Sequence, residues 1–276
     1  MMLLRQSIAA ARLFPHVLAG IVLLVLTGAL WNNKSSLVKR TKQWWLGGIV
    51  QLLGIDVEVH GEVPQPEPGR GLLYVSNHIS WVDIPLIGGL TQLNFLSKAE
   101  VRGWPLIGKL AEGTGTLFIQ RGSGDAGRVA KAIADYLDEG RSVLFFPEGT
   151  TSDGSSVGRF HKRLFQAGQH TAVQMCPIAI HYCVPASGDN PVAFIDDDEF
   201  THHLWRVLRH RKIQARVQFL PLRSLEPTAL EHFVAQVQGE VAASVADHHR
   251  QAGTNTNTQW PDASTPAARE DGAASF

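Results

Sequence analysis

The stretch LLYVSNHISWVDIP, residues 72–85, is the most informative part of this chain. Its first residues, 72–75, are apolar or aromatic and predict a short strand buried in a sheet. A polar turn with Asn77 and His78 follows the strand, and Asp83 comes five residues after the histidine. Because sheets present reactive groups on the loops at their strand ends, this stretch predicts a buried sheet with a chemical site at its edge.

His78 and Asp83 form a candidate pair of general base and orienting carboxylate. A histidine titrates near neutral pH and can take a proton from a hydroxyl. A carboxylate bonded to the other ring nitrogen fixes the tautomer and stabilises the imidazolium. Since no serine or cysteine has an evident nucleophilic role, the pattern predicts direct attack by a substrate hydroxyl, with general-base help worth about 10²–10⁴ in rate. The alternative is a histidine and an aspartate that only cap a turn.

Two further segments place charged residues at predicted strand ends. GTLFIQR, residues 115–121, ends at Arg121 and opens into a glycine-rich turn. That arrangement suits the capture of an anion such as phosphate, and the alternative is an ordinary surface arginine. FFPEGTTSDG, residues 145–154, places Glu148 between a proline and a glycine after a buried strand. Glu148 can bond a substrate hydroxyl or orient Arg121, and the alternative is a polar turn.

A fourth segment, MCPIAIH at residues 175–181, predicts a buried strand that begins at Pro177 and packs in the core. Cys176 and Cys183 have no reactive pattern around them, so we interpret both as small apolar residues.

Short apolar strands alternate with amphipathic helices in the rest of the chain. This alternation predicts an α/β fold with a mixed, largely buried central sheet flanked by helices. The predicted strands cover residues 55–60, 72–75, 94–98, 117–119, 143–146, 177–184 and 213–219, and the predicted helices cover residues 83–90, 125–139, 200–212 and 227–246.

The N-terminal arm is basic and apolar. Residues 1–50 hold six basic residues and no acidic one, whereas the other 226 residues hold 19 basic and 25 acidic residues. Residues 13–33 carry no formal charge, and about 20 apolar residues span a hydrocarbon core. We therefore predict a retained membrane anchor; a cleaved signal peptide and a helix lying on the bilayer are the alternatives. Basic residues cluster after this segment, which places the following domain in the cytoplasm, at the inner membrane.

The predicted domain organisation has three parts. Residues 1–54 form the membrane anchor and a second basic helix, whose Trp44 and Trp45 either sit at the headgroup level or pack in the core. Residues 55–249 form the catalytic domain, and residues 250–276, rich in Thr, Asn, Ala and Ser, form a disordered tail.

Composition and histidine spacing exclude several classes. Lys plus Arg and Asp plus Glu are 25 each, which argues against a dedicated nucleic-acid binder. Two cysteines cannot build a disulfide framework. The adjacent pairs His202–His203 and His248–His249 lie on predicted helices, where neighbours point apart, so we expect no metal site.

Taken in order, the four segments resemble the glycerolipid acyltransferase family, the PlsC-like lysophosphatidic acid acyltransferases. The resemblance covers about residues 55–220 and matches the first three family motifs at every fixed letter. The motif N-H-x-x-x-x-D is met by Asn77, His78 and Asp83; G-x-x-F-x-x-R by Gly115, Phe118 and Arg121; F-P-E-G-T-x-S by Phe146, Pro147, Glu148, Gly149, Thr150 and Ser152; and the fourth motif, a proline in an apolar strand, by Pro177.

The resemblance implies an enzyme that moves a fatty acyl chain from acyl-ACP or acyl-CoA to the free hydroxyl of 1-acylglycerol 3-phosphate, giving phosphatidic acid. In such an enzyme His78 is the general base and Asp83 its orienter, while Arg121 and the Glu148–Gly149 turn hold the glycerol phosphate. Neither an acyl-enzyme, a metal nor a cofactor is expected. The resemblance also implies substrate contacts from the remaining motif residues Asn77, Gly115, Phe118 and Thr150.

Some residues depart from that pattern. Gln120 stands where an acidic residue often precedes the motif arginine. The SWVD form at residues 80–83 and the FHKRLF run at residues 160–165 look closer to a branch that includes lyso-ornithine-lipid acyltransferases. An ornithine headgroup has no phosphate, so Arg121 would then bind a carboxylate or a carbonyl. A thioesterase, in which His78 activates water, and a membrane scaffold without activity are the rival classes.

Overall fold

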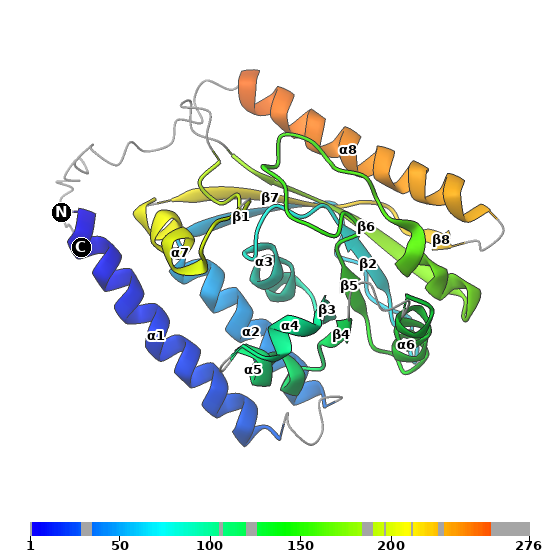
Figure 1. The fold of residues 1–276 in the computed structure, drawn as a ribbon, viewed down its shortest axis with the longest axis horizontal. Coiled ribbons are helices and arrows are strands. Elements are labelled where there is room, and N and C mark those ends of the chain that lie inside the picture. Colours follow the sequence, from blue (N-terminus) through cyan, green and yellow to red (C-terminus); the bar gives the residue numbers. More distant parts are fainter. Residues whose placement is uncertain are drawn as a thin grey trace, which may run out of the picture.

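The computed structural model describes residues 2–28, 35–104, 107–119, 126–183, 190–195, 197–210, 212–225 and 229–254. Its centre is a sheet in the order β1-β7-β6-β2-β5-β3-β4, with β8 paired to β6 (Figure 1). The strands are β1 (Ile55–His60), β2 (Leu73–Ser76), β3 (Asn94–Lys98), β4 (Leu117–Ile119), β5 (Val143–Phe145), β6 (Val173–Tyr182), β7 (Ile213–Phe219) and β8 (Arg223–Leu225). The helices are α1 (Met2–Leu26), α2 (Ser36–Leu52), α3 (Asp83–Leu90), α4 (Ala99–Arg102), α5 (Ile107–Gly113), α6 (Ala126–Asp138), η1 (Lys162–Gln169), α7 (Phe200–Arg209) and α8 (Leu230–Thr254).

The sheet is mixed. β2 pairs in parallel with β5 and with β6, and β3 pairs in parallel with β5 and β4. β6 runs antiparallel to β7 and β8, and β1 is parallel to β7. The predicted α/β fold with a mixed, buried sheet is therefore confirmed.

Alternating side chains of β2 explain why both faces of the sheet are covered. Tyr74 belongs to a core that contains residues of α2, α3 and α7, whereas Leu73 and Val75 belong to a second core that contains residues of α6, η1 and α8. Figure 1 shows α8 on one side of the sheet and α1, α2, α3 and α7 on the other. A strand buried on both faces must be apolar at consecutive positions, as residues 72–75 are.

Most predicted elements occur with small changes at their ends. The bounds of β1, β3, β4, β7 and α3 are those predicted. Helix α7 ends at Arg209, earlier than predicted, and α8 continues to Thr254, so residues 250–254 of the expected tail are helical. Residues 255–276 lie outside the described residues, and α4, α5, η1 and β8 were not predicted.

The prediction that Pro177 begins a strand is wrong, because β6 begins four residues earlier at Val173. The Pro177 carbonyl accepts a bond from the Leu220 amide, so its missing N–H faces the same side, towards β7 and β8. On that side the β8 ladder ends at Met175 and the β7 ladder begins at Ile178. Proline therefore occupies a gap between two ladders, where it removes no ladder hydrogen bond.

Helix α1 packs along α2 and reaches α7. Gln6 Nε2 donates to the Trp205 carbonyl (3.1 Å), and Trp45 Nε1 donates to the His16 carbonyl (3.2 Å). A Cβ atom at Gly20 would lie 2.1 Å from the Trp45 indole, so only glycine allows this approach. Trp45 is buried in the core, whereas Trp44 is 58% exposed, so a position at the headgroup level stays a prediction for Trp44 alone. Among the described residues, Gln6–Leu26 of α1 is the one segment long and apolar enough to cross a membrane, and little of it is buried.

Candidate active site

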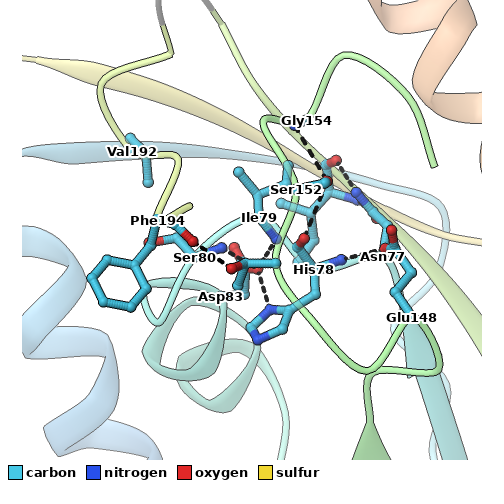
Figure 2. Close-up of polar contacts among 12 residues, drawn as sticks. Asn77, His78, Ile79, Ser80, Asp83, Glu148, Ser152, Gly154, Val192 and Phe194 are labelled. Carbon is cyan, nitrogen blue, oxygen red and sulfur yellow. Dashed lines mark hydrogen bonds and ion pairs between the residues drawn. The ribbon is translucent and has the colours of Figure 1, made fainter. Parts of the chain in front are cut away.

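Three adjacent parallel strands, β5, β2 and β6, bring the polar residues to one edge of the sheet. His78 comes shortly after the end of β2, Glu148 shortly after the end of β5, and Tyr182 is the last residue of β6. Parallel neighbours end at the same edge, so residues far apart in the sequence meet there. This edge is the candidate active site (Figure 2).

The His78 ring contacts the Asp83 carboxylate. His78 Nδ1 lies 2.8 Å from Asp83 Oδ2, and the Asp83 side chain is fully buried. An ionised carboxylate only accepts hydrogen bonds, so Nδ1 carries the proton and Nε2 of the neutral ring keeps a lone pair. In Figure 2 the second ring nitrogen points away from Asp83. The His78 side chain is 17% exposed and stacks on Phe146, with ring centroids 3.8 Å apart.

Four donors fix the Asp83 carboxylate. Besides His78, Oδ2 accepts the backbone amides of Ile79 (2.7 Å) and Ser80 (3.0 Å). Oδ1 accepts the Tyr182 hydroxyl at 2.8 Å. Burial, and then the adjacent Asp83 charge, raise the pKa of Tyr182 well above its usual value, so the phenol stays protonated and donates. The carboxylate is thus fully buried and fully bonded, as a buried charge requires.

Glu148 uses its carboxylate to hold backbone. Oε1 accepts the His78 amide (2.8 Å) and Oε2 accepts the Gly158 amide (2.7 Å). Burial raises the pKa of Glu148, while these two amide bonds act in the opposite direction. A Cβ atom at Gly158 would lie 2.6 Å from Glu148 Oε2, so glycine permits this contact. Glu148 therefore ties the loop after β5 to the histidine.

The loop that follows Glu148 also supports His78. Gly149 adopts a positive φ of 75° and turns the chain, and Thr150 is exposed at the turn. Ser152 then donates its backbone amide to the His78 carbonyl (2.9 Å). Thr151 donates its hydroxyl to the Phe194 carbonyl, so this loop is also bonded to the segment before α7.

The other predicted site residues occupy different places. Asn77 is buried, and its side-chain amide exchanges two bonds with the Ile180 backbone (2.9 and 2.8 Å), which joins β2 to β6. Gly115 precedes β4 with a positive φ of 80°, at the sheet edge opposite His78. Phe118 lies within β4, beneath the Arg102 guanidinium. Arg121 lies outside the described residues.

Sequence analysis missed Tyr182 and Gly158. Tyr182 continues an alternation with Ile178 and Ile180, which indicates a core position and says nothing of its hydroxyl. Gly158 stands ten residues after Glu148 with no motif around it. The Cys176 thiol is buried, and burial raises its pKa to about 12, in agreement with an apolar role.

A group of three histidines lies on the other face of β6, and we call it the rear histidine cluster: His181, His248 and His249. His181 Nε2 lies 3.2 Å from His249 Nδ1, and His249 Nε2 donates to the Gly154 carbonyl (3.1 Å). Burial, followed by the charges of His249, His248 and Arg216, lowers the pKa of His181 to about 3. Within the described part of the chain, no group of three or more His, Cys, Asp or Glu side chains is arranged to hold a metal ion.

Comparison with known proteins identifies the family of this chain. The sequence model of the Acyltransferase family matches residues 56–181, which include His78, Asp83 and Glu148. A lyso-ornithine lipid O-acyltransferase from Pseudomonas aeruginosa is 42% identical over 224 residues, which cover 79% of this chain and 84% of that protein. A 1-acyl-sn-glycerol-3-phosphate acyltransferase from Neisseria meningitidis is 32% identical over 174 residues, which cover 63% of this chain and 68% of that protein.

The fold has a solved counterpart. The crystal structure of PlsC, the 1-acyl-sn-glycerophosphate acyltransferase of Thermotoga maritima, matches with a TM-score of 0.68 and 19% identity, over 90% of this chain and 98% of that one. The chain belongs to the PlsC-like glycerolipid branch of the acyltransferase family. It is an enzyme of lipid biosynthesis that transfers acyl groups, as the four motifs predicted.

Proposed function

We propose that this enzyme transfers a fatty acyl group from a thioester donor to the hydroxyl of a lyso-ornithine lipid, with His78 as the general base. The observation that carries the chemistry is the 2.8 Å contact between His78 Nδ1 and the buried Asp83 carboxylate. It leaves Nε2 as a proton acceptor at the strand edge.

The reaction needs no enzyme nucleophile. His78 Nε2 removes the proton of the acceptor hydroxyl while its oxygen attacks the thioester carbonyl. Asp83 stabilises the imidazolium that forms. When the tetrahedral intermediate collapses, the C–S bond breaks, the proton on Nε2 passes to the departing thiolate, and an ester and a thiol result. The donor is acyl-ACP or acyl-CoA.

Two observations favour the ornithine acceptor. The Pseudomonas relative, whose name gives lyso-ornithine lipid as acceptor, is 42% identical across 84% of its own length. The sequence segments at residues 80–83 and 160–165 point to the same branch. Acylation of 1-acylglycerol 3-phosphate, our first expectation, is the second candidate, and the 32% identity to the Neisseria enzyme supports it.

The remaining site residues are assigned by proposal. Arg121 binds the anionic group of the acceptor, the carboxylate of an ornithine headgroup or the phosphate of the second candidate. The Glu148–Gly149 turn and Thr150 contact the same acceptor, with Glu148 holding His78 in place. Asn77 joins β2 to β6 beside His78, whereas Gly115 and Phe118 shape β4, the strand that precedes Arg121 in the sequence. We propose that catalysis takes place on the cytoplasmic side of the inner membrane, to which α1 and the exposed Arg40 of α2 bind.

The deciding experiment is an acceptor panel. Purified full-length protein in detergent receives radiolabelled acyl-CoA or acyl-ACP with lyso-ornithine lipid, with 1-acylglycerol 3-phosphate, or with no acceptor. The His78→Ala variant is the blank. We expect labelled ornithine lipid, and thioester loss only when an acceptor is present.

Each other result has a clear meaning. Labelled phosphatidic acid without ornithine lipid would reject the ornithine assignment in favour of the second candidate. Thioester loss at the same rate with and without acceptor would identify a thioesterase. No turnover with any acceptor or donor would support a scaffold role.

A further inference from the structure

The Asp83 carboxylate has a donor that does not belong to its own turn. Oδ2 accepts three donors from the segment around it, whereas Oδ1 accepts the hydroxyl of Tyr182, 99 residues further along the chain. We propose that Tyr182 is a positioning residue, which fixes the rotation of the Asp83 carboxylate and sets how strongly that carboxylate holds the charge of His78. This inference rests on the proposed role of His78 as the base.

The direction of the Tyr182 hydrogen bond is unambiguous. Tyr182 and Asp83 are 1% and 0% exposed, so water does not compete for either group. An ionised carboxylate offers only lone pairs, so the phenol must donate. Hydrogen bonds to a charged group contribute about 1.5–3 kcal/mol, which is enough to affect a coupled imidazole.

The position of the phenol is itself held by a family motif residue. Asn77 bonds both backbone groups of Ile180, two residues before Tyr182. The parallel ladder between β2 and β6 runs up to the pair Ser76 and Ile178, just before this clasp. Asn77 therefore fixes the end of β6, and this places the Tyr182 hydroxyl next to the Asp83 carboxylate.

Loss of the hydroxyl has a predictable electrostatic effect. The Tyr182 bond draws negative charge towards Oδ1, away from the oxygen that faces His78. Without it, Oδ2 holds the imidazolium more strongly, so the histidine stays protonated to a higher pH. A carboxylate with one free oxygen is also less restricted in rotation, which loosens the orientation of the base.

The test is Tyr182→Phe, which removes one oxygen atom, with Tyr74→Phe as a matched control. Tyr74 is also fully buried, but it lies on β2 and its hydroxyl donates to the Pro64 carbonyl (3.3 Å), away from Asp83. For Tyr182→Phe we expect kcat to fall about 10-fold, with both KM values within about 2-fold of the parent. We also expect the acid limb of the kcat/KM profile to move up by about 0.5–1 pH unit. Tyr74→Phe should leave the limb in place.

A Tyr182→Phe enzyme with the kcat and pH profile of Tyr74→Phe would overturn the inference. Activity in His78→Ala would instead overturn the proposed function, so the two failures are distinguishable. If Tyr182→Phe does not fold, as judged by thermal unfolding, 3-fluorotyrosine at position 182 provides the second test. Its more acidic phenol donates more strongly, so the acid limb should move down, and an unmoved limb would contradict the proposal.

Discussion

Two consecutive residues of β6, His181 and Tyr182, lie next to two histidine sites, the rear histidine cluster and His78. The contacts that support the histidines differ between the two sites. Tyr182 points to the face where Asp83 holds His78, and His181 points to the opposite face, into the rear histidine cluster under α8. His78 has a carboxylate on Nδ1 and is partly exposed. His181 is 2% exposed, its Nε2 bonds another histidine, and its Nδ1 has no partner.

This difference bears on the proposed role of His78 as a base. Burial together with neighbouring positive charge lowers the pKa of His181 to about 3, so it stays neutral at physiological pH and bonds only as a structural group. Burial, with Arg216 as the next contributor, also lowers the pKa of His248. At the candidate active site the buried Asp83 carboxylate lies against the His78 ring, an arrangement that fits the proposed transfer of a proton.

The largest effect should come from removing the base itself. His78→Ala should lower kcat by about 10⁴-fold, the upper end for general-base catalysis, and leave membrane association unchanged. Acyl transfer and membrane fractionation measure the two properties. His202→Ala is the control, because its side chain is 80% exposed on α7. Activity of His78→Ala close to that of this control would remove His78 from the mechanism.

Asp83→Asn should have the next largest effect, because it leaves His78, like the members of the rear histidine cluster, without a carboxylate partner. The neutral amide cannot stabilise an imidazolium, so we expect kcat to fall about 10²-fold. Steady-state kinetics and a thermal unfolding curve separate lost chemistry from lost structure. If Asp83→Asn is stable and as active as the parent protein, His78 does not need the negative charge of Asp83.

Glu148→Gln should have a smaller effect on activity. The carboxylate accepts two backbone amides, and a glutamine must turn its own NH₂ group towards one of them. The glutamine NH₂ and the backbone N–H that it faces are then two donors without an acceptor, which costs about 1–3 kcal/mol. We therefore expect about a 10-fold loss of kcat and a lower Tm. Glu62→Gln at an exposed position is the control. Equal kinetics for the two variants would mean that Glu148 does not position His78.

The smallest effect on activity is expected from the rear histidine cluster, where the predicted change concerns stability. The pKa of His181 is about 3 in the folded chain and 6.5 in the unfolded one, so its contribution to stability is complete above pH 6.5 and is lost as the pH falls towards 3. Each pH unit in that range costs up to about 1.4 kcal/mol. The Tm of His181→Leu should therefore fall less than that of the parent protein when the pH is lowered from about 7 to about 5. His202→Leu should leave the fall in Tm unchanged. If Tm of His181→Leu falls with pH as steeply as that of the parent protein, the pH dependence of stability does not come from His181.

The sequence predicts those contacts of the candidate active site that join residues close in the chain. It does not predict the contacts between distant segments. His78 and Asp83 are five residues apart, so a turn suffices to join them. Tyr182 reaches Asp83 only because β6 lies beside β2 in one register, and strand order is set by packing of the whole sheet. The start of β6 was missed for a related reason, since Pro177 is tolerated only where two neighbouring ladders leave a gap.

The bond from His249 to Gly154 has a practical consequence. Gly154 donates its amide to Ser152 Oγ, and Ser152 donates its own amide to the His78 carbonyl. The last turns of α8 are thereby linked by hydrogen bonds to the backbone of His78, the proposed base. Truncation before residue 249, or a fusion partner that unwinds those turns, should impair catalysis in a protein whose sheet remains intact, so purification handles belong further downstream.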